Sequence, residues 1–223
     1  QICGAGPAHG LPARLCARTT DPRSRTLLND IAAASADTDR ADDPAAFPTT
    51  SAVPPAADET SFAELGLSDA VLRAVAEKGY LTPTPIQREA IPVVLMGRDV
   101  LGTAQTGTGK TAGFTLPLID ILSGSRARAR MPRALILEPT RELALQVAEN
   151  FVQYGKYLKL THALVIGGES MADQKDLLMR GVDVLIATPG RLIDMFERGS
   201  ILLTDARVLV IDEADRMLDM GFI

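Results

Sequence analysis

A glycine-rich segment of the chain carries residue types that, at this spacing, can bind a polyphosphate. Gly107 and Gly109 allow the backbone to adopt positive φ, so that successive N–H groups converge on the phosphates. Lys110 adds a positive charge for the outer phosphates, and the Thr111 hydroxyl can ligate Mg²⁺. The nucleotide-binding residues predicted here are Ala104, Gln105, Thr106, Gly107, Thr108, Gly109, Lys110 and Thr111.

The same glycines also fit the start of a dinucleotide-binding motif, Gly107-x-Gly109-x-x-Ala112. That motif requires an acidic residue about 20 positions further on, at the end of a second strand. Ala127 stands near this position among arginines, so the required acid is missing. The strict phosphate-loop pattern has glycine where this chain has Ala104, which is a small change in size. We therefore favour the phosphate loop.

Two carboxylates that follow the apolar run 208–211, Asp212 and Glu213, could supply the second half of an ATP site. Acids at the carboxyl end of a buried strand lie where open α/β sheets bind ligands. The first can hold Mg²⁺, usually through water, and the second can orient and deprotonate an attacking water. Alone, the pattern is equally typical of a solvated acidic turn. Combined with the phosphate loop, it predicts an ATPase with catalytic residues Lys110, Asp212 and Glu213 and metal ligands Thr111 and Asp212.

Alternating apolar and amphipathic runs predict the scaffold that would position these residues. Strands are predicted at 134–137, 163–166, 184–187 and 208–211. Helices are predicted between Ser68 and Gly79 and at 85–96, 111–122 (with a kink at Pro117), 140–157, 171–179, 189–198 and 216–220. Near-continuous apolar strands separated by helices are typical of a parallel sheet covered on both faces, so the predicted fold class is α/β.

Composition and charge restrict the remaining classes of function. Residues 1–58 are rich in Ala, Pro and Asp and lack any apolar period, which predicts a disordered leader before a domain at 59–223. Both cysteines lie in this leader and no long apolar run occurs, so we expect a cytoplasmic protein without a membrane partner. The net charge of −5 means that nucleic-acid binding must rest on local patches. The one basic cluster, at 126–130, is interpreted as a solvated loop.

Short motifs, in order along the chain from Phe62 to the last residue, resemble those of the DEAD-box ATP-dependent RNA helicases, in a bacterial, RhlE-like wording. They are Phe62 with the segment GYLTPTPIQ, the phosphate loop, the segments PTRELA, GG and TPGR, and the sequence Asp212-Glu213-Ala214-Asp215. The resemblance implies a RecA-like P-loop NTPase domain, ATP and Mg²⁺ as cofactors and RNA as partner. It further implies that the full protein separates short RNA duplexes.

The resemblance also implies roles for individual residues. Gln87 would read the adenine edge through its amide, which both donates and accepts, and Phe62 would pack beside the base or anchor the preceding segment. Asp215 would couple hydrolysis to unwinding. The implied RNA-backbone contacts are Pro139, Thr140, Arg141, Gly167, Gly168, Thr188, Pro189, Gly190 and Arg191. Thr140 and Thr188 stand where helices should begin, and free N–H groups there bind phosphates without base identity.

The family works with two RecA-like domains, and this chain stops about eight residues after Asp215. We therefore expect a partial first domain whose missing partner is the second RecA-like domain, with weak nucleotide binding, slow hydrolysis and no unwinding by the chain alone. Ribosome- or RNA-decay-associated proteins are further candidate partners. Two alternatives stay open, a P-loop ATPase that acts on DNA or protein and a non-catalytic nucleotide- or RNA-binding module.

Overall fold

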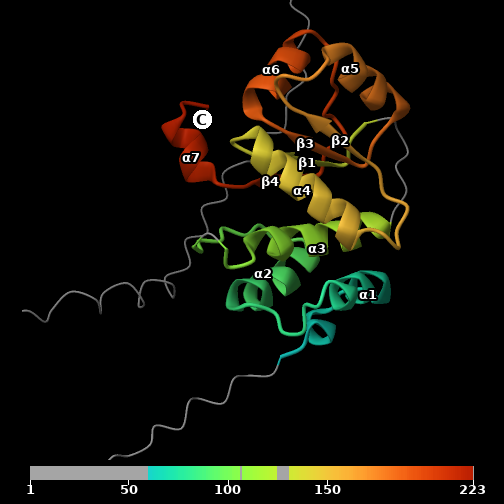
Figure 1. The fold of residues 1–223 in the computed structure, drawn as a ribbon, viewed down its shortest axis with the longest axis vertical. Coiled ribbons are helices and arrows are strands. Elements are labelled where there is room, and N and C mark those ends of the chain that lie inside the picture. The colour runs from blue at the N-terminus through green and yellow to red at the C-terminus, as the bar shows by residue number, and fades with distance from the viewer. Residues whose placement is uncertain (1–59, 106, 125–130, 223) are drawn as a thin grey trace, which may run out of the picture. The chain divides into compact units, whose positions relative to one another are not determined.

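The computed structural model describes residues 60–105, 107–124 and 131–222, and Figure 1 shows their arrangement. The predicted leader, Thr106 of the phosphate loop, the basic cluster at 126–130 and Ile223 lie outside the described residues. Within the described ranges, no helix combines the length and the apolar character needed to cross a membrane.

Four parallel strands form the sheet, in the spatial order β2-β3-β1-β4. They are β1 (Ala134–Leu137), β2 (His162–Val165), β3 (Val184–Ala187) and β4 (Val208–Ile211). The last residue of β1, Leu137, lies opposite Ala187 on one side and Ile211 on the other. Because the strands are parallel and aligned, the loops that follow them meet at one edge of the sheet.

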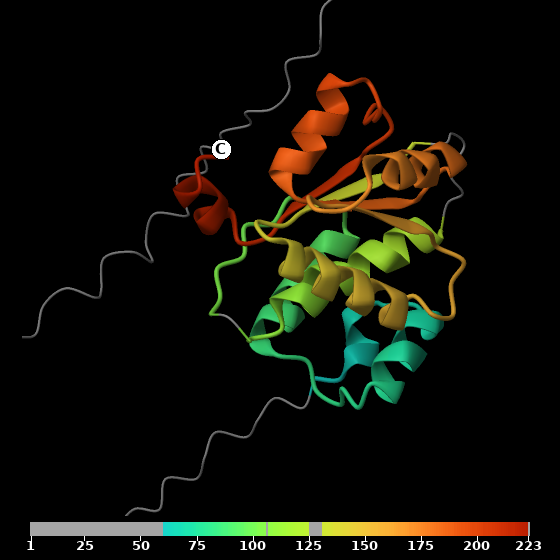
Figure 2. The same ribbon diagram turned by 45° about the horizontal axis from the view of Figure 1, so that its top comes forward.

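Helices cover both faces of the sheet, as predicted. They are the 3-10 helix η2 (Phe62–Leu65) and the α-helices α1 (Asp69–Glu77), α2 (Pro85–Leu95), α3 (Lys110–Ser123), α4 (Arg141–Tyr154), α5 (Met171–Arg180), α6 (Pro189–Glu197) and α7 (Ala214–Asp219). Figure 2 shows α5 and α6 on one face and α1 to α4 on the other. Successive strand residues point to opposite faces, so Ile136 packs in the core with α3 and α4, whereas Leu135 packs with α5 and α6.

Several boundaries differ from the prediction. The helix predicted at 140–157 ends at Tyr154, where Gly155 forms the cap and donates its N–H to the Phe151 carbonyl. The helix predicted at 216–220 occupies Ala214–Asp219, because the chain turns sharply at Glu213 directly after β4. The strand predicted at 163–166 lies one residue earlier. Pro117 lies inside α3, which continues to Ser123.

The segment before the phosphate loop pairs with no strand in the described part of the chain. Val100 and Leu101 are 44% and 96% exposed. The edge strand β4 also leaves Leu209 and Ile211 accessible, at 58% and 42%. The buried apolar residues of the sheet therefore lie mainly in the central strands β1 and β3, whereas the residues of β4 are only partly buried.

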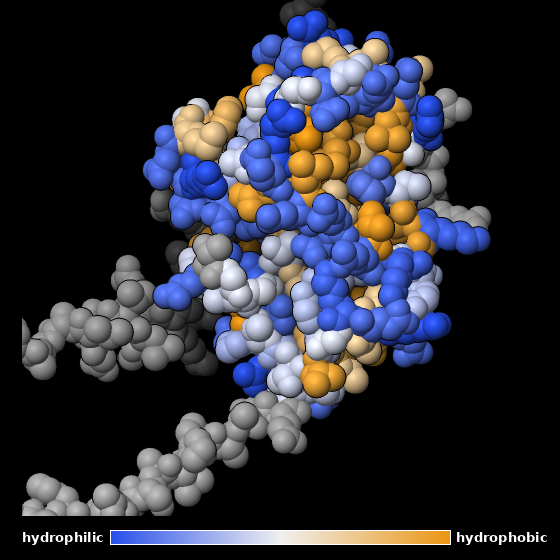
Figure 3. All heavy atoms as spheres, viewed as in Figure 1, coloured by the Kyte–Doolittle hydropathy of each residue, from blue (hydrophilic) through white to orange (hydrophobic). Residues whose placement is uncertain are grey.

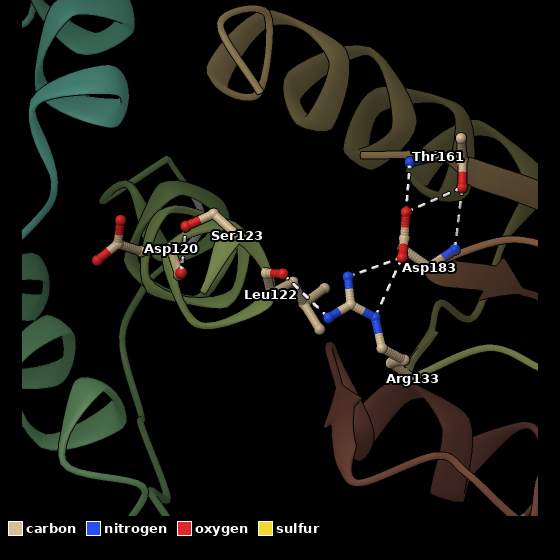
Figure 4. A network of polar contacts seen from close by, with 6 residues as sticks. All are labelled: Asp120, Leu122, Ser123, Arg133, Thr161 and Asp183. Carbon is tan, nitrogen blue, oxygen red and sulfur yellow. Dashed lines mark hydrogen bonds and ion pairs between the residues drawn. The ribbon is translucent and has the colours of Figure 1, made fainter. Parts of the chain in front are cut away.

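The amino-terminal edge of the sheet is held by a network around Asp183, which Figure 4 shows. One carboxylate oxygen of Asp183 accepts from Arg133 Nε at 3.1 Å and Nη2 at 2.7 Å. The other accepts from the N–H and the hydroxyl of Thr161, at 2.9 and 3.0 Å. Arg133 Nη1 donates to the Leu122 carbonyl at 3.0 Å. These bonds tie the last turn of α3 to the residues that precede β1, β2 and β3.

Candidate functional site

The phosphate loop leads directly into α3, which begins at Lys110. Gly107 and Gly109 have φ of 84° and 88°, as their predicted role requires. A Cβ at Gly109 would also collide with the amide of Gln87, so a side chain is excluded there on two grounds. The Thr108 hydroxyl donates to the Gln105 carbonyl at 2.7 Å and closes the turn.

The structure brings the phosphate loop and the acids after β4 together. Lys110 Nζ lies 3.5 Å from a carboxylate oxygen of Glu213, and both side chains are about a quarter exposed. Asp212 accepts the N–H of Glu213 at 3.0 Å. Burial raises the pKa of Asp212, and this bond and Lys110 offset part of that effect. In the described residues, Glu213 is the only non-glycine residue with positive φ, at 50°. Such a conformation costs about 1–2 kcal/mol and occurs most often at functional positions.

Sequence analysis missed a third acid at this edge, Glu138. It follows β1 directly, is fully buried, and neither of its carboxylate oxygens has a hydrogen-bond partner in the part of the chain that the structure describes. Burial raises the pKa of Glu138 to about 8, and the charges of Asp212 and Glu213 add to the effect. The only signal in the sequence is an acid that immediately follows an apolar run, the same signal that was used for Asp212.

Gln87 is bound by the protein itself in this structure. Its Oε1 accepts the Thr84 N–H at 3.0 Å, its Nε2 donates to the Gly109 carbonyl at 3.0 Å, and the residue is 4% exposed. The amide therefore links the start of α2 to the phosphate loop. One N–H and one lone pair remain for an adenine edge. Phe62 is 5% exposed and packs in the core, which agrees with its alternative interpretation as an apolar anchor.

Most of these groups border one cavity of about 640 Å³, but Gln105, Thr108 and Glu138 do not line it. Lys110, Asp212 and Glu213 lie on the wall of this cavity together with Phe62 and Gln87. The volume is within the range of about 300–1,000 Å³ typical of small-molecule sites. The cavity thus combines the predicted phosphate-binding and base-binding residues in a single space that can accommodate a nucleotide.

The donor set fits a magnesium ion that arrives with a nucleotide. No group of three or more His, Cys, Asp or Glu residues able to hold a metal occurs among the described residues. Mg²⁺ ordinarily keeps several waters and uses one or two carboxylates together with phosphate oxygens. Thr111 and Asp212 border the same cavity and can supply a hydroxyl and a carboxylate of this kind.

A second hollow, of about 480 Å³, collects the residues predicted to contact RNA. All of them line it except Gly168 and Pro189, which lie beside residues that do. The apolar Met220 and Phe222, after α7, and the acidic Glu142 and Asp194 also line it and were not predicted. Figure 3 shows apolar side chains on the surface of this part of the molecule. The lining of the hollow therefore combines two arginines, two carboxylates and two large apolar side chains.

Two arginines hold defined positions in the second hollow. The Arg141 guanidinium lies over Gly168, where a Cβ would collide with it, and Gly168 has φ of 82°. Arg191 Nη1 donates to the Glu169 carbonyl and to Gln174 Oε1, both at 3.2 Å. Gln174 was not predicted, and a glutamine in an amphipathic helix gives no signal that it is buried.

The helix starts at the second hollow agree only in part with their predicted capping. The Thr140 hydroxyl accepts the Leu143 N–H at 3.3 Å, as an N-cap does. Thr188 precedes Pro189 at the first position of α6 but makes no side-chain cap.

Asp215 is exposed and accepts the N–H of Arg216 at 2.9 Å. Its role in coupling stays a prediction.

Comparison with known proteins decides the family, because residues 84–223 match the model of the DEAD/DEAH box helicases. The chain belongs to the DEAD/DEAH box helicase family. The family identified from the motifs is thereby confirmed, and so is the α/β, RecA-like fold class. The RhlE-like subgroup stays a prediction.

Named relatives of this DEAD/DEAH box chain include two helicases. It is 51% identical over 181 residues to the ATP-dependent RNA helicase DeaD of Mycobacterium tuberculosis (strain CDC 1551 / Oshkosh), covering 79% of this chain and 31% of that protein. It is 48% identical over 184 residues to the DEAD-box ATP-dependent RNA helicase 52A of Oryza sativa subsp. japonica, covering 76% and 30%. The chain thus spans about a third of the length of these curated relatives.

Solved structures agree with this assignment. A DEAD box protein from the hyperthermophile Methanococcus jannaschii is similar with a TM-score of 0.68 and 39% identity, over 73% of this chain and 44% of that one. The RNA-helicase Prp28 from Chaetomium thermophilum, bound to ADP, is similar with a TM-score of 0.69 and 42% identity, over 73% and 40%.

Proposed function

We propose that this chain is the ATP-binding part of an ATP-dependent RNA helicase and also carries part of its RNA-binding surface. The observation that carries the proposal is the approach of Lys110 to Glu213, at 3.5 Å, on the wall of a nucleotide-sized cavity. The relatives named as ATP-dependent RNA helicases support it. Since the chain covers about a third of those proteins, duplex separation is assigned to the whole protein.

In this proposal Lys110 changes its partner when nucleotide binds. In the free chain its ammonium neutralises Glu213. The outer phosphates would take over Lys110, which leaves the Glu213 carboxylate free to orient and deprotonate the attacking water. Mg²⁺, held by Thr111 and Asp212, would neutralise charge on the phosphates. The N–H groups of the loop around Gly107 and Gly109 would bind the phosphate oxygens.

The second hollow is proposed to bind the sugar-phosphate backbone of a single RNA strand. The N-termini of α4 and α6 meet there, and Arg141 and Arg191 supply positive charge. Helix N-termini and guanidinium groups recognise phosphates without reading the base. The proposed contact is therefore independent of sequence, and the 2′-hydroxyl is the feature that can distinguish RNA from DNA.

The test is ATP binding and hydrolysis by the 223-residue chain, with single-stranded RNA, with DNA of the same sequence, and with GTP in place of ATP. We expect ATP binding that Lys110→Ala weakens, and slow hydrolysis that RNA stimulates. Glu213→Gln should lower hydrolysis about 10²-fold or more, because it removes the general base. Glu149→Gln, at an exposed position of α4, is the matched control.

The alternatives predict different results. Equal stimulation by DNA and RNA would favour an ATPase that acts on DNA. RNA binding without ATP binding would favour a non-catalytic module. Turnover by this chain is expected to be slower than that of the whole protein, since the chain spans about a third of the length of its relatives.

A further inference from the structure

One buried amide connects the loop after β2 with the first turn of α6, beside the second hollow. Gln174 lies on α5 and is only 7% exposed, although both its neighbours in sequence are exposed. Its Nε2 donates to the Ile166 carbonyl at 3.0 Å, in a buried hydrogen bond. Its Oε1 accepts from Arg191 Nη1 at 3.2 Å. The side chain thus uses its donor on the loop after β2 and its acceptor on the first turn of α6.

These bonds hold both ends of the Gly167–Gly168 turn. Gln174 binds the carbonyl of Ile166, directly before the turn, and Arg191 binds the carbonyl of Glu169, directly after it. The turn contains positive φ at Gly168 and has no side chain of its own to anchor it. Its conformation therefore depends on groups outside it, and Gln174 contacts both the turn's start and the arginine at its end.

The chemistry of this position requires an amide. A carboxylate cannot donate to the Ile166 carbonyl, and a cationic side chain cannot accept from Arg191. Ile166 is 2% exposed, so water cannot readily replace the missing donor at its carbonyl. An apolar residue of the same length would leave a buried carbonyl and one guanidinium N–H without these partners, which is unfavourable.

We propose that Gln174 is a positioning residue for nucleic-acid binding, which orients Arg191 and the Gly167–Gly168 turn toward the phosphates of one strand. This rests on the proposed RNA-binding function of the second hollow. Gln174 acts through Arg191 and the turn and makes no contact with RNA itself. A residue that only stabilised the fold would lower the melting temperature without changing the number of phosphate contacts.

The first experiment measures the affinity for single-stranded RNA as a function of salt. Gln174→Met keeps the length of the side chain and removes its donor and its acceptor. We expect about tenfold weaker binding, because hydrogen bonds to charged groups are the strong ones. The slope of log affinity against log salt should become shallower by about 0.7, the value for one phosphate contact on a single strand. Arg191→Met should do the same, and the double variant should be no weaker than either single variant.

Gln153→Met is the matched control, since Gln153 is exposed on α4 and binds Lys78. It should leave both the affinity and the salt slope unchanged. ATP affinity, measured in parallel, reports whether each variant is folded. The proposal is overturned if Gln174→Met weakens RNA binding further in a chain that already carries Arg191→Met and leaves the salt slope unchanged.

A second readout needs no RNA. Amide hydrogen exchange of Gly167, Gly168 and Glu169 should be faster in Gln174→Met than in the parent chain, and unchanged in Gln153→Met. Unchanged exchange at this turn would refute positioning by Gln174. If the parent chain binds no RNA even at low salt, the proposed function fails, while hydrogen exchange still decides whether Gln174 holds the turn.

Discussion

A carboxylate is buried at each end of the sheet, and the two differ in whether the carboxylate has hydrogen-bond partners. Asp183, before β3, is 8% exposed and accepts hydrogen bonds from Arg133 and Thr161. Glu138, after β1, is fully buried and has no partner among the described residues. Buried polar groups are nearly always paired, so an unpaired carboxyl group calls for a reason. The hydrogen bonds at the amino-terminal edge therefore stabilise the fold, whereas the carboxyl-terminal edge carries the residues of the proposed catalytic site.

The electrostatics at the carboxyl-terminal edge are unbalanced. Glu138, Asp212 and Glu213 influence one another there, and Lys110 contacts Glu213 and acts on Asp212 through its charge. Such a site favours a proton or an added cation over three free negative charges. The unpaired acid and the positive φ of Glu213 both cost stability, and both occur beside the proposed catalytic groups. The hydrogen-bond network around Asp183 at the opposite edge does not offset either cost directly. It does, however, hold in place the strands that carry Glu138 and Glu213.

The largest expected effect on stability comes from removing the partner of the paired carboxylate, Asp183. Arg133→Met leaves Asp183 buried without a counter-charge, and it also removes the bond to the Leu122 carbonyl. We expect the free energy of unfolding to fall by about 3–5 kcal/mol, because the charge of Asp183 stays desolvated. Urea denaturation of the parent and variant chains measures this difference.

Its control is an arginine in an exposed ion pair. Arg73 binds Glu77 at 3.3 Å, and the two side chains are 68% and 41% exposed. Arg73→Met should change the free energy of unfolding by less than about 1 kcal/mol, because surface pairs contribute little. Equal losses in the two variants would show that the network around Asp183 does not hold the amino-terminal edge.

The unpaired carboxyl group of Glu138 predicts that the stability of the chain depends on pH. The pKa of Glu138 is raised from 4.5 to about 8 in the folded chain, so its contribution to stability is complete below pH 4.5 and is lost as the pH rises through 8. At about 1.4 kcal/mol per pKa unit, the free energy of unfolding should fall by roughly 2–3 kcal/mol between pH 5 and pH 7. Asp212 and Glu213 face Glu138 and act in the same direction, and Lys110 opposes them at Asp212.

Glu138→Gln isolates this effect, since it keeps the volume of the side chain and removes the ionisable proton. The difference in stability between the two chains should change with pH over the range 5 to 8. Parallel profiles would mean that Glu138 does not titrate in this range, and the contrast between the two edges would lose its electrostatic basis.

The sequence was sufficient for the parts of the molecule that depend on local pattern. Apolar runs such as 134–137 and 208–211 are continuous enough to predict parallel strands, and the end of the run 208–211 places Glu213 at the carboxyl-terminal edge, although β4 is less buried than predicted. The positive φ of Gly107 and Gly109 followed from the chemistry of phosphate binding. These features depend on residue type and spacing alone.

The features that sequence analysis missed depend on pairs that are distant in the chain. Gln87 binds the Gly109 carbonyl, and Gln174 binds Arg191, and no periodicity in the sequence specifies either of these long-range contacts. Glu138 is buried because β3 and β4 flank it, while the sequence shows only an acid after a strand. The end of α4 was predicted too late, because the residues after Gly155 are also compatible with a helix.

The prediction with the smallest expected effect on stability tests the backbone conformation of Glu213 rather than the charge at the carboxyl-terminal edge. Glu213→Asn and Glu213→Gln both replace the acid with a neutral amide, so each removes the ion pair with Lys110. They differ in backbone preference, since Asn adopts positive φ more readily than Gln. At the φ of 50° found here, the Asn variant should be more stable by about 0.5–1 kcal/mol, part of the left-handed penalty. Thermal or urea unfolding of the two variants gives the difference directly. Equal stability would show that the turn at Glu213 relaxes without cost, and that the carboxyl-terminal edge stores strain only in its unpaired charges.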